Sequence, residues 1–215
     1  NDPDGMNINT NCGSTHIEVL QEYVKEKKLD VDAHVTTVLF NDQYKMLYNR
    51  RELKDVRKMT DKDYTPGGMT ALLDAVGRTI HKMDMVSGIH RKDKGNKVLF
   101  VIITDGEEND SREYTYADVK KLIKDRQENA GWEFIFLGAN IDAAAAAENL
   151  GIDRDRAVKY KNTGSGVRAN FKAVAELSDS LAKSGRVSDE WKETVEKDED
   201  DAADKQSAAV TLHRR

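Results

Sequence analysis

The sequence predicts an α/β fold: a doubly wound, mostly parallel sheet with helices on both faces and one antiparallel edge hairpin. Apolar segments of strand length alternate with segments whose apolar residues recur at helical spacing. One of them, Val98–Thr104, is apolar or Thr throughout, which is typical of a strand buried on both faces of a parallel sheet. The 215 residues include only two prolines and no Gly/Ser-rich linker, so they favour one domain with an appendage.

The elements follow one another from the N-terminus. Thr15 and Glu18 match a capping box, and Ile17, Leu20 and Val24 then share one helical face. The expected strands are HVTTVLF (34–40), YKMLYN (44–49), VLFVIIT (98–104), WEFIFLGA (132–139) and RAVKY (156–160). An Asn-Asp turn at 41–42 makes the first two strands a hairpin. The expected helices are TALLDAVGRTIHKM (70–83), TYADVKKLIKDRQE (115–128), DAAAAAENLG (142–151) and a long final helix over 167–185.

Composition excludes several classes of protein. A net charge of −5 argues against general nucleic-acid binding, which needs a basic stripe. No apolar run approaches the ~18 residues of a membrane helix, and the N-terminus shows no signal-peptide pattern. The one cysteine, Cys12, rules out an internal disulfide and fits a reducing compartment. We therefore expect a cytoplasmic protein, or one in a virion or the host cytoplasm if a phage encodes it.

The predicted domain covers residues 1–185, and residues 186–215 form an acidic C-terminal extension. This extension has few apolar residues and an acidic run, Glu196–Asp201, so we expect it to be partly disordered. Trp191 and Val195 are exceptions that would pin one more helical turn to the domain.

Asp105 is the first candidate site residue. It follows the most apolar strand of the chain, and ligands of open parallel sheets bind at the carboxyl ends of the strands. A buried carboxylate there needs a partner: a backbone amide, a basic side chain or a metal ion. The alternative is a strand-end aspartate that caps the turn at Gly106, since Asp-Gly is a common turn pair. Glu107 and Glu108 would extend an acidic rim, although solvated turn residues explain them equally simply.

A glycine loop supplies the second candidate. Gly67 and Gly68 let the backbone approach a ligand or partner closely, and Thr70 then stands at the start of a helix. The simpler interpretation of Thr70 is an N-cap. A phosphate loop has weak support, because neither the Walker pattern nor GxGxxG is present.

Together, the Gly-Gly-x-Thr loop, the helix and the apolar strand ending Thr-Asp-Gly resemble the von Willebrand factor A (vWA) domain. The resemblance runs from about Ile17 to Phe171 and is closest to small intracellular vWA proteins of bacteria and phages. It implies that Thr70 is a metal ligand of a metal-ion-dependent adhesion site (MIDAS). It implies that Asp105 is the carboxylate that reaches the ion through water. Such hard oxygen donors suit Mg²⁺ or Mn²⁺.

One motif of that family is absent. The family carries Asp-x-Ser-x-Ser at the end of its first, central strand, and this sequence has no such motif. Either that strand lies before Asn1, or the motif has degenerated to Asn9, Asn11 and Ser14, which bring no charge. "MNIN" (6–9) would be a poor central strand, because only Met6 and Ile8 are apolar.

The sequence thus favours a protein-binding module rather than an enzyme. A divalent ion held by Thr70 and Asp105 would bind an exposed Asp or Glu of a protein partner. The loops Asp42–Tyr44, Thr65–Met69 and Glu107–Arg112 would supply specificity. Two alternatives stay open: a metal-free structural subunit of a phage or bacterial assembly, and a Mg²⁺-dependent phosphate-ester hydrolase that uses Asp105. Cys12 with His16 is a weak candidate for a nucleophile and base.

Overall fold

The computed structural model describes residues 33–57, 62–63, 67–85, 97–187, 189–193 and 195–196. The predicted first helix, the weak candidates Asn9, Asn11 and Ser14, and the pair Cys12 and His16 lie outside these residues. The acidic end of the chain after Glu196 also lies outside them.

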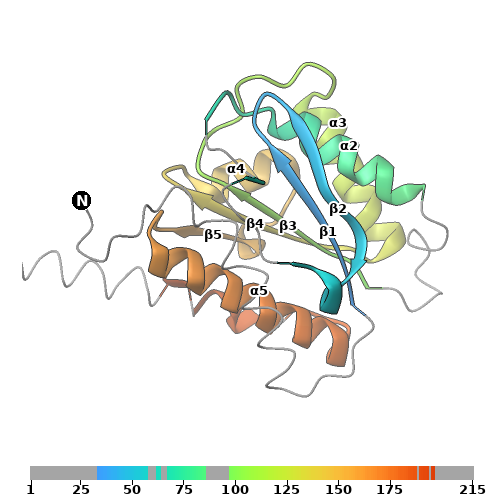
Figure 1. The fold of residues 1–215 in the computed structure, drawn as a ribbon, viewed down its shortest axis with the longest axis vertical. Helices are drawn as coiled ribbons and strands as arrows, with labels where there is room; N and C mark the ends of the chain where they lie inside the picture. The colour runs from blue at the N-terminus through green and yellow to red at the C-terminus, as the bar shows by residue number, and fades with distance from the viewer. Residues whose placement is uncertain are drawn as a thin grey trace, which may run out of the picture.

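The described strands form two sheets (Figure 1). β1 (His34–Phe40) and β2 (Tyr44–Glu52) pair as an antiparallel hairpin, as the Asn-Asp turn predicts. β3 (Leu99–Thr104), β4 (Glu133–Ala139) and β5 (Ala157–Tyr160) form a parallel sheet in that order. The predicted α/β class with a parallel sheet and an antiparallel hairpin is confirmed, and the hairpin is a sheet of its own.

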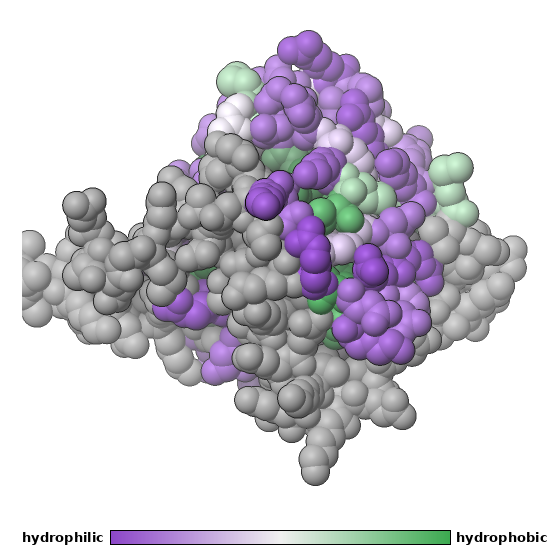
Figure 2. Space-filling view, viewed as in Figure 1, coloured by the Kyte–Doolittle hydropathy of each residue, from purple (hydrophilic) through white to green (hydrophobic). Residues whose placement is uncertain are grey.

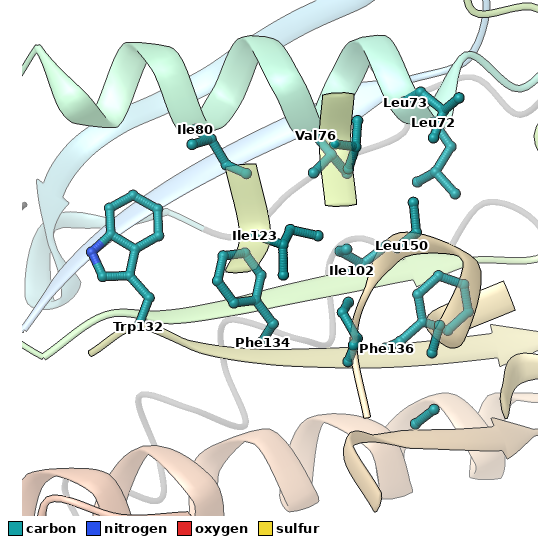
Figure 3. Packing of buried hydrophobic residues seen from close by; sticks show 14 of the residues in the cluster. Leu72, Leu73, Val76, Ile80, Ile102, Ile123, Trp132, Phe134, Phe136 and Leu150 are labelled. Atoms are coloured by element: carbon teal, nitrogen blue, oxygen red, sulfur yellow. The ribbon is translucent and has the colours of Figure 1, made fainter. Parts of the chain in front are cut away.

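Helices cover both faces of the parallel sheet. α2 (Leu72–Asp84), α3 (Tyr116–Asp125) and α4 (Ala143–Leu150) bury their apolar residues against Phe134 and Phe136 of β4 (Figure 3). α5 (Gly164–Ser184) packs on the opposite face. Strand residues alternate between the two cores, as the two-residue period of a strand requires. Short helical turns complete the fold at Leu53–Asp55, Arg126–Ala130, Arg154–Arg156 and Asp189–Lys192.

Local sequence signals set the helix ends. Thr115 and Asp118 form a reciprocal capping box at the start of α3. Asp142 caps α4 by accepting a hydrogen bond from the Ala145 N–H. α4 and α5 end at Gly151 and Gly185, both with positive φ, where glycine avoids a steric penalty. None of the helices in the described part of the chain has the length and apolar character needed to cross a membrane.

β3 is less buried than its sequence predicts. Only Ile102 and Thr104 of this strand are buried, while every residue of β4 after Glu133 is buried. The physical reason is position: β4 lies between two strands, and β3 is at the end of the described parallel sheet. β3 is nevertheless covered on both faces, as its sequence predicts: Phe100 and Ile102 pack in one core, and Val101 and Ile103 pack against the other.

Part of the chain that follows α5 packs against the domain. Val187, Trp191 and Val195 belong to the core under α5, and all three are nearly inaccessible to solvent. Trp191 also donates a hydrogen bond from Nε1 to the Asp155 carbonyl at 3.3 Å. Trp191 and Val195 thus hold the chain after α5 against the domain, as their apolar character predicts.

Candidate functional site

The loop before α2 meets the ends of two strands. The Ala71 N–H donates to the carbonyl of Asn41, which directly follows β1, at 2.9 Å. The Asn109 N–H donates to the Thr70 carbonyl at 3.0 Å, and the Thr70 N–H donates to Asn109 Oδ1 at 2.7 Å. Asn109 belongs to the loop after β3. These contacts place Thr70 at the carboxyl ends of β1 and β3, where the sequence predicts the site.

The Thr70 hydroxyl points towards the turn after β3. A Cβ built on Gly106 would lie 3.1 Å from Thr70 Oγ1, so only a glycine fits there without displacing the hydroxyl. α2 starts at Leu72, and its N-cap residue is Ala71 rather than Thr70. The alanine side chain makes no capping hydrogen bond. The simpler interpretation of Thr70 as an N-cap is thus not what the structure shows.

Asp105 is exposed, which corrects the expectation of a buried carboxylate. Its side chain makes no hydrogen bond or ion pair within the part of the chain that is described. The turn is held by its neighbour instead: Thr104 Oγ1 donates to the Gly106 carbonyl at 2.9 Å and accepts from the Gly106 N–H at 3.3 Å. Asp105 is therefore not needed to cap the turn, and this exposed residue directly precedes Gly106, the glycine that Thr70 Oγ1 approaches.

The two loop glycines adopt backbone angles that favour glycine. Gly67 has φ of 133° and Gly68 has φ of 89°. Asn41 Nδ2 donates to the Gly67 carbonyl at 2.9 Å. A side chain at Gly68 would overlap Asp42 Oδ1 and Asn41 Nδ2. The glycine loop therefore packs against the hairpin turn, and Asp42 lies next to the predicted site.

Glu108 does not belong to the acidic rim that the sequence predicts around Asp105. Its carboxylate accepts from the Leu73 N–H at 2.9 Å, from the Asp110 and Ser111 N–H groups, and from the Ser111 hydroxyl at 2.8 Å. Leu73 is in the first turn of α2, whose N–H groups lack intrahelical acceptors. Glu108 thus caps α2 from the following loop, and Glu107 alone is the exposed acid of the pair.

Asp74 ties the same loop to α2 more deeply. Its buried carboxylate accepts from the backbone N–H groups of Arg112, Glu113 and Tyr114 at 2.9–3.1 Å. Burial alone would raise the pKa of Asp74, but these three donors and the nearby Arg78 together lower it below its ordinary value. The loop after β3 is therefore rigidly positioned by charged hydrogen bonds.

Apolar side chains lie exposed beside the site. Met69, directly before Thr70, is 50% exposed, and Tyr116 is 43% exposed. Burial raises the pKa of the Tyr116 phenol, and the charges of Glu108 and Glu107 raise it further. Met69 lies within a predicted specificity loop. Tyr116 was missed, because a tyrosine at the start of a predicted helix carries no signal of exposure.

Two hollows flank the site. One, of about 930 Å³, lies at the ends of β4 and β5, and Glu107, Asn140, Asp142, Lys159 and Lys161 contribute to its lining. The other, of about 270 Å³, lies on the hairpin side, and Asp42, Tyr44, Asp74, Arg78 and Arg112 contribute to its lining. The sequence indicates that ligands bind at this edge of the sheet, but it does not show where loops leave space.

The described donor set for a cation is small. Thr70 Oγ1 and the Asp105 carboxylate are hard oxygen donors of the type that Mg²⁺ and Mn²⁺ accept. Within the described ranges, no group of three or more His, Cys, Asp or Glu side chains gathers in a way that would hold a metal ion. Thr70 and Asp105 therefore provide the kind of oxygen donor that Mg²⁺ or Mn²⁺ binds. Water or a partner would have to supply most of the other ligands of the ion.

No family model matches the chain. Short segments match curated phosphoglucosamine mutases. The enzyme of Ruminiclostridium cellulolyticum is 64% identical over 31 residues, which are 14% of this chain and 7% of the enzyme. That of Alkaliphilus metalliredigens is 72% identical over 29 residues, or 14% of this chain and 6% of the enzyme. That of Caldicellulosiruptor saccharolyticus is 49% identical over 47 residues, or 20% and 10%. The chain thus spans a tenth or less of the length of these three relatives.

Proposed function

We propose that this chain is a protein-binding module of the vWA type that engages an acidic group of a protein partner through a divalent metal ion. The observation that carries the proposal is the approach of Thr70 Oγ1 to Gly106, the residue that follows the exposed Asp105. The resemblance of the glycine loop and the Thr-Asp-Gly turn to the vWA pattern supports it.

The surroundings of Thr70 suit a partner rather than a small substrate. Met69 and Tyr116 are large, exposed side chains of the kinds enriched in protein interfaces. The loop is held in place by Asp74 and Glu108, so little ordering entropy would be lost on binding. When bound, Mg²⁺ would supply a bridge between the two negative groups. Thr70 and Asp105 would hold the ion, and the partner carboxylate would complete its ligands.

A thermal melt in Mg²⁺, Mn²⁺ and EDTA tests the metal site. A native-state ligand at ten times its dissociation constant stabilises by about 1.4 kcal/mol, or roughly 3–6 °C in Tm. We expect that rise in the wild-type chain, its loss in Asp105→Ala and Thr70→Val, and its recovery in Thr70→Ser, which keeps the hydroxyl.

Asp153→Ala is the matched control, because it removes an exposed carboxylate at the other edge of the sheet, before β5. A rise that survives in Asp105→Ala, or that disappears in Asp153→Ala, contradicts the proposed site. Partner binding is then measured with a peptide bearing a single Glu and its Gln analogue, with and without Mg²⁺.

The segments similar to phosphoglucosamine mutase favour an enzyme as the second candidate. They cover 14% to 20% of this chain. Phosphoglucosamine isomerisation that this chain catalyses, and that Asp105→Asn abolishes, would replace the binding proposal with a metal-dependent enzyme of phosphate esters.

A further inference from the structure

The larger of the two hollows beside the site lies where β4 and β5 end. α4 leaves the end of β4 towards one face of the sheet, and α5 leaves the end of β5 towards the other (Figure 1). Because these two connections diverge, they leave a crevice of about 930 Å³ at the strand ends. Ligands of open parallel sheets bind in crevices of this kind. The crevice is therefore a second position at which this edge of the sheet can bind a ligand.

Lys159 is a charged group that β5 contributes to the crevice. Its neighbours Val158 and Tyr160 belong to the core under α5, so the alternation of side chains along a strand turns Lys159 to the opposite face. Lys159 is exposed and makes no ion pair within the described part of the chain. Such a cation can form a charge-assisted hydrogen bond with a carboxylate of a ligand.

The strand register connects Lys159 with the proposed metal site. Thr104 of β3 pairs with Gly138 of β4, and Gly138 pairs with Lys159 of β5. The three residues form one row across the sheet, so two strand spacings place Thr104 and Lys159 about 10 Å apart. Asp105 directly follows Thr104, and Glu107 of the same loop lines the crevice. The crevice therefore reaches the loop that carries Asp105.

The lining of the crevice suits a polypeptide better than a small molecule. Sites for small molecules enclose most of the ligand surface, whereas four residues of this lining are exposed: Glu107, Asn140, Asp142 and Lys159. In the view of Figure 2, most of the described surface is hydrophilic. A partner at this edge would therefore be recognised through charge and hydrogen bonds more than through apolar packing.

The two hollows differ in charge. The lining of the one on the hairpin side has an excess of acids: Asp42, Asp74, Asp110 and Glu113 against Arg78 and Arg112. The lining of the crevice has as many lysines as acids: Lys159 and Lys161 with Glu107 and Asp142. Asp142 already accepts the capping hydrogen bond from the Ala145 N–H. A carboxylate next to the metal site is therefore repelled on the hairpin side and meets cations on the side of β5.

We infer that Lys159 binds a second carboxylate of the protein partner, and that Lys159 is thus a specificity-determining residue of the site. The inference rests on the proposed function, because the metal ion binds the first carboxylate. An extended chain advances about 3.3 Å per residue, so the row of about 10 Å corresponds to roughly three residues. The partner segment is therefore extended and carries two acidic residues separated by about two others.

Binding of short peptides to the full chain in Mg²⁺ tests the inference. The probes are three peptides with blocked ends, GGEGGEGG, GGEGGQGG and GGQGGQGG, whose dissociation constants are compared by NMR titration. We expect the peptide with two glutamates to bind about threefold more tightly than the peptide with one, which is the size of an exposed ion pair. This gain should decrease as the salt concentration rises.

Variants of Lys159 show whether this residue is the cause of the gain. Lys159→Gln should abolish the gain and Lys159→Arg should keep it, while both leave binding of the single-glutamate peptide unchanged. The matched control is Lys172→Gln, which removes an exposed lysine of α5 that does not line the crevice. This control should keep the gain. A thermal melt of each variant without peptide checks that its fold is retained.

The outcomes separate the inference from the proposed function. A second glutamate that adds no affinity, while the single-glutamate peptide binds in Mg²⁺, overturns the inference and leaves the proposed function standing. A gain that survives in Lys159→Gln, or that disappears in Lys172→Gln, also overturns it, because another group would then bind the second carboxylate. If the single-glutamate peptide binds no better than GGQGGQGG in Mg²⁺, the proposed function fails and the inference fails with it.

Discussion

β3 and β4 are neighbouring parallel strands of nearly equal apolar content, and they differ in burial and in how their ends are fixed. Phe134, Ile135, Phe136 and Leu137 of β4 are all inaccessible to solvent. Their counterparts in β3 are mostly half-buried. The end of β4 leads directly into α4, whereas the end of β3 is fastened by polar contacts between its loop and α2. Strand composition indicates that a sheet forms, and the number of neighbours decides how deeply each strand is buried.

The largest expected effect is a difference in the free energy of unfolding between alanine variants of two phenylalanines that pair directly across the strands. Phe100 and Phe134 are in register, and their rings stack with centroids 5.2 Å apart. Phe134→Ala should lower the free energy of unfolding by about 3–5 kcal/mol, since it opens a cavity in a close-packed core. Phe100→Ala should cost roughly half as much, because it already contacts solvent. Urea unfolding measures both, and equal losses would mean that the β3 edge is covered in solution.

An intermediate effect concerns the polar fastening of β3. Asp74→Ala should cost about 2–4 kcal/mol at neutral pH, because three backbone N–H groups lose a charged acceptor. The folded-state pKa of Asp74 is below the ordinary 3.8, so its stabilisation is complete above that pH. It is lost as the pH falls through the lower folded-state pKa. Asp74→Asn should remove this part of the acid dependence in urea unfolding from pH 6 to pH 2. An unchanged pH profile in Asp74→Asn would contradict the assignment.

The smallest expected losses of stability come from alanine substitutions of two glycines, one near the end of β4 and one after the end of β3. A Cβ at Gly138 of β4 would lie 2.9–3.1 Å from Ile141 and Ala143 in the core, so Gly138→Ala should cost about 1–3 kcal/mol by overpacking. Among the described residues, a Cβ at Gly106 would meet the Thr70 hydroxyl alone, and Gly106→Ala should cost less than about 1 kcal/mol. If Thr70 holds a metal, Gly106→Ala also reduces the Mg²⁺-dependent rise in Tm and Gly138→Ala does not. A thermal melt of both variants decides this.

The sequence predicts the elements well where local signals act. The hairpin turn at Asn41, the capping box at Thr115 and the glycine ends of α4 and α5 all lie where propensity places them. It also brings Thr70 and the turn after Thr104 to one edge, because parallel strands share that edge. These features depend on a few neighbouring residues.

Tertiary context explains what the sequence did not predict. Glu108 and Asp74 look like surface acids in the sequence. Only the fold shows that the Glu108 carboxylate accepts from an N–H of α2, and that the Asp74 carboxylate accepts from an N–H of the loop after β3. Asp105 was expected to be buried because of the strand before it, yet its exposure depends on the turn that Thr104 holds. Tyr116 is the first residue of α3, and its exposure has no signal in the sequence around it.

The first turn of α2 takes its hydrogen-bond acceptors from residues far along the chain. Leu73 is bonded to Glu108, 35 positions later, and Asp74 is bonded to Ser111, 37 positions later. During synthesis α2 therefore leaves the ribosome before the residues that cap it, and its first turn frays until β3 and its loop have docked. The closure of that long loop is an entropic cost that precedes the capping bonds. α2 and β3 should consequently fold as one cooperative unit, so that α2 on its own would be a helix without a stable beginning.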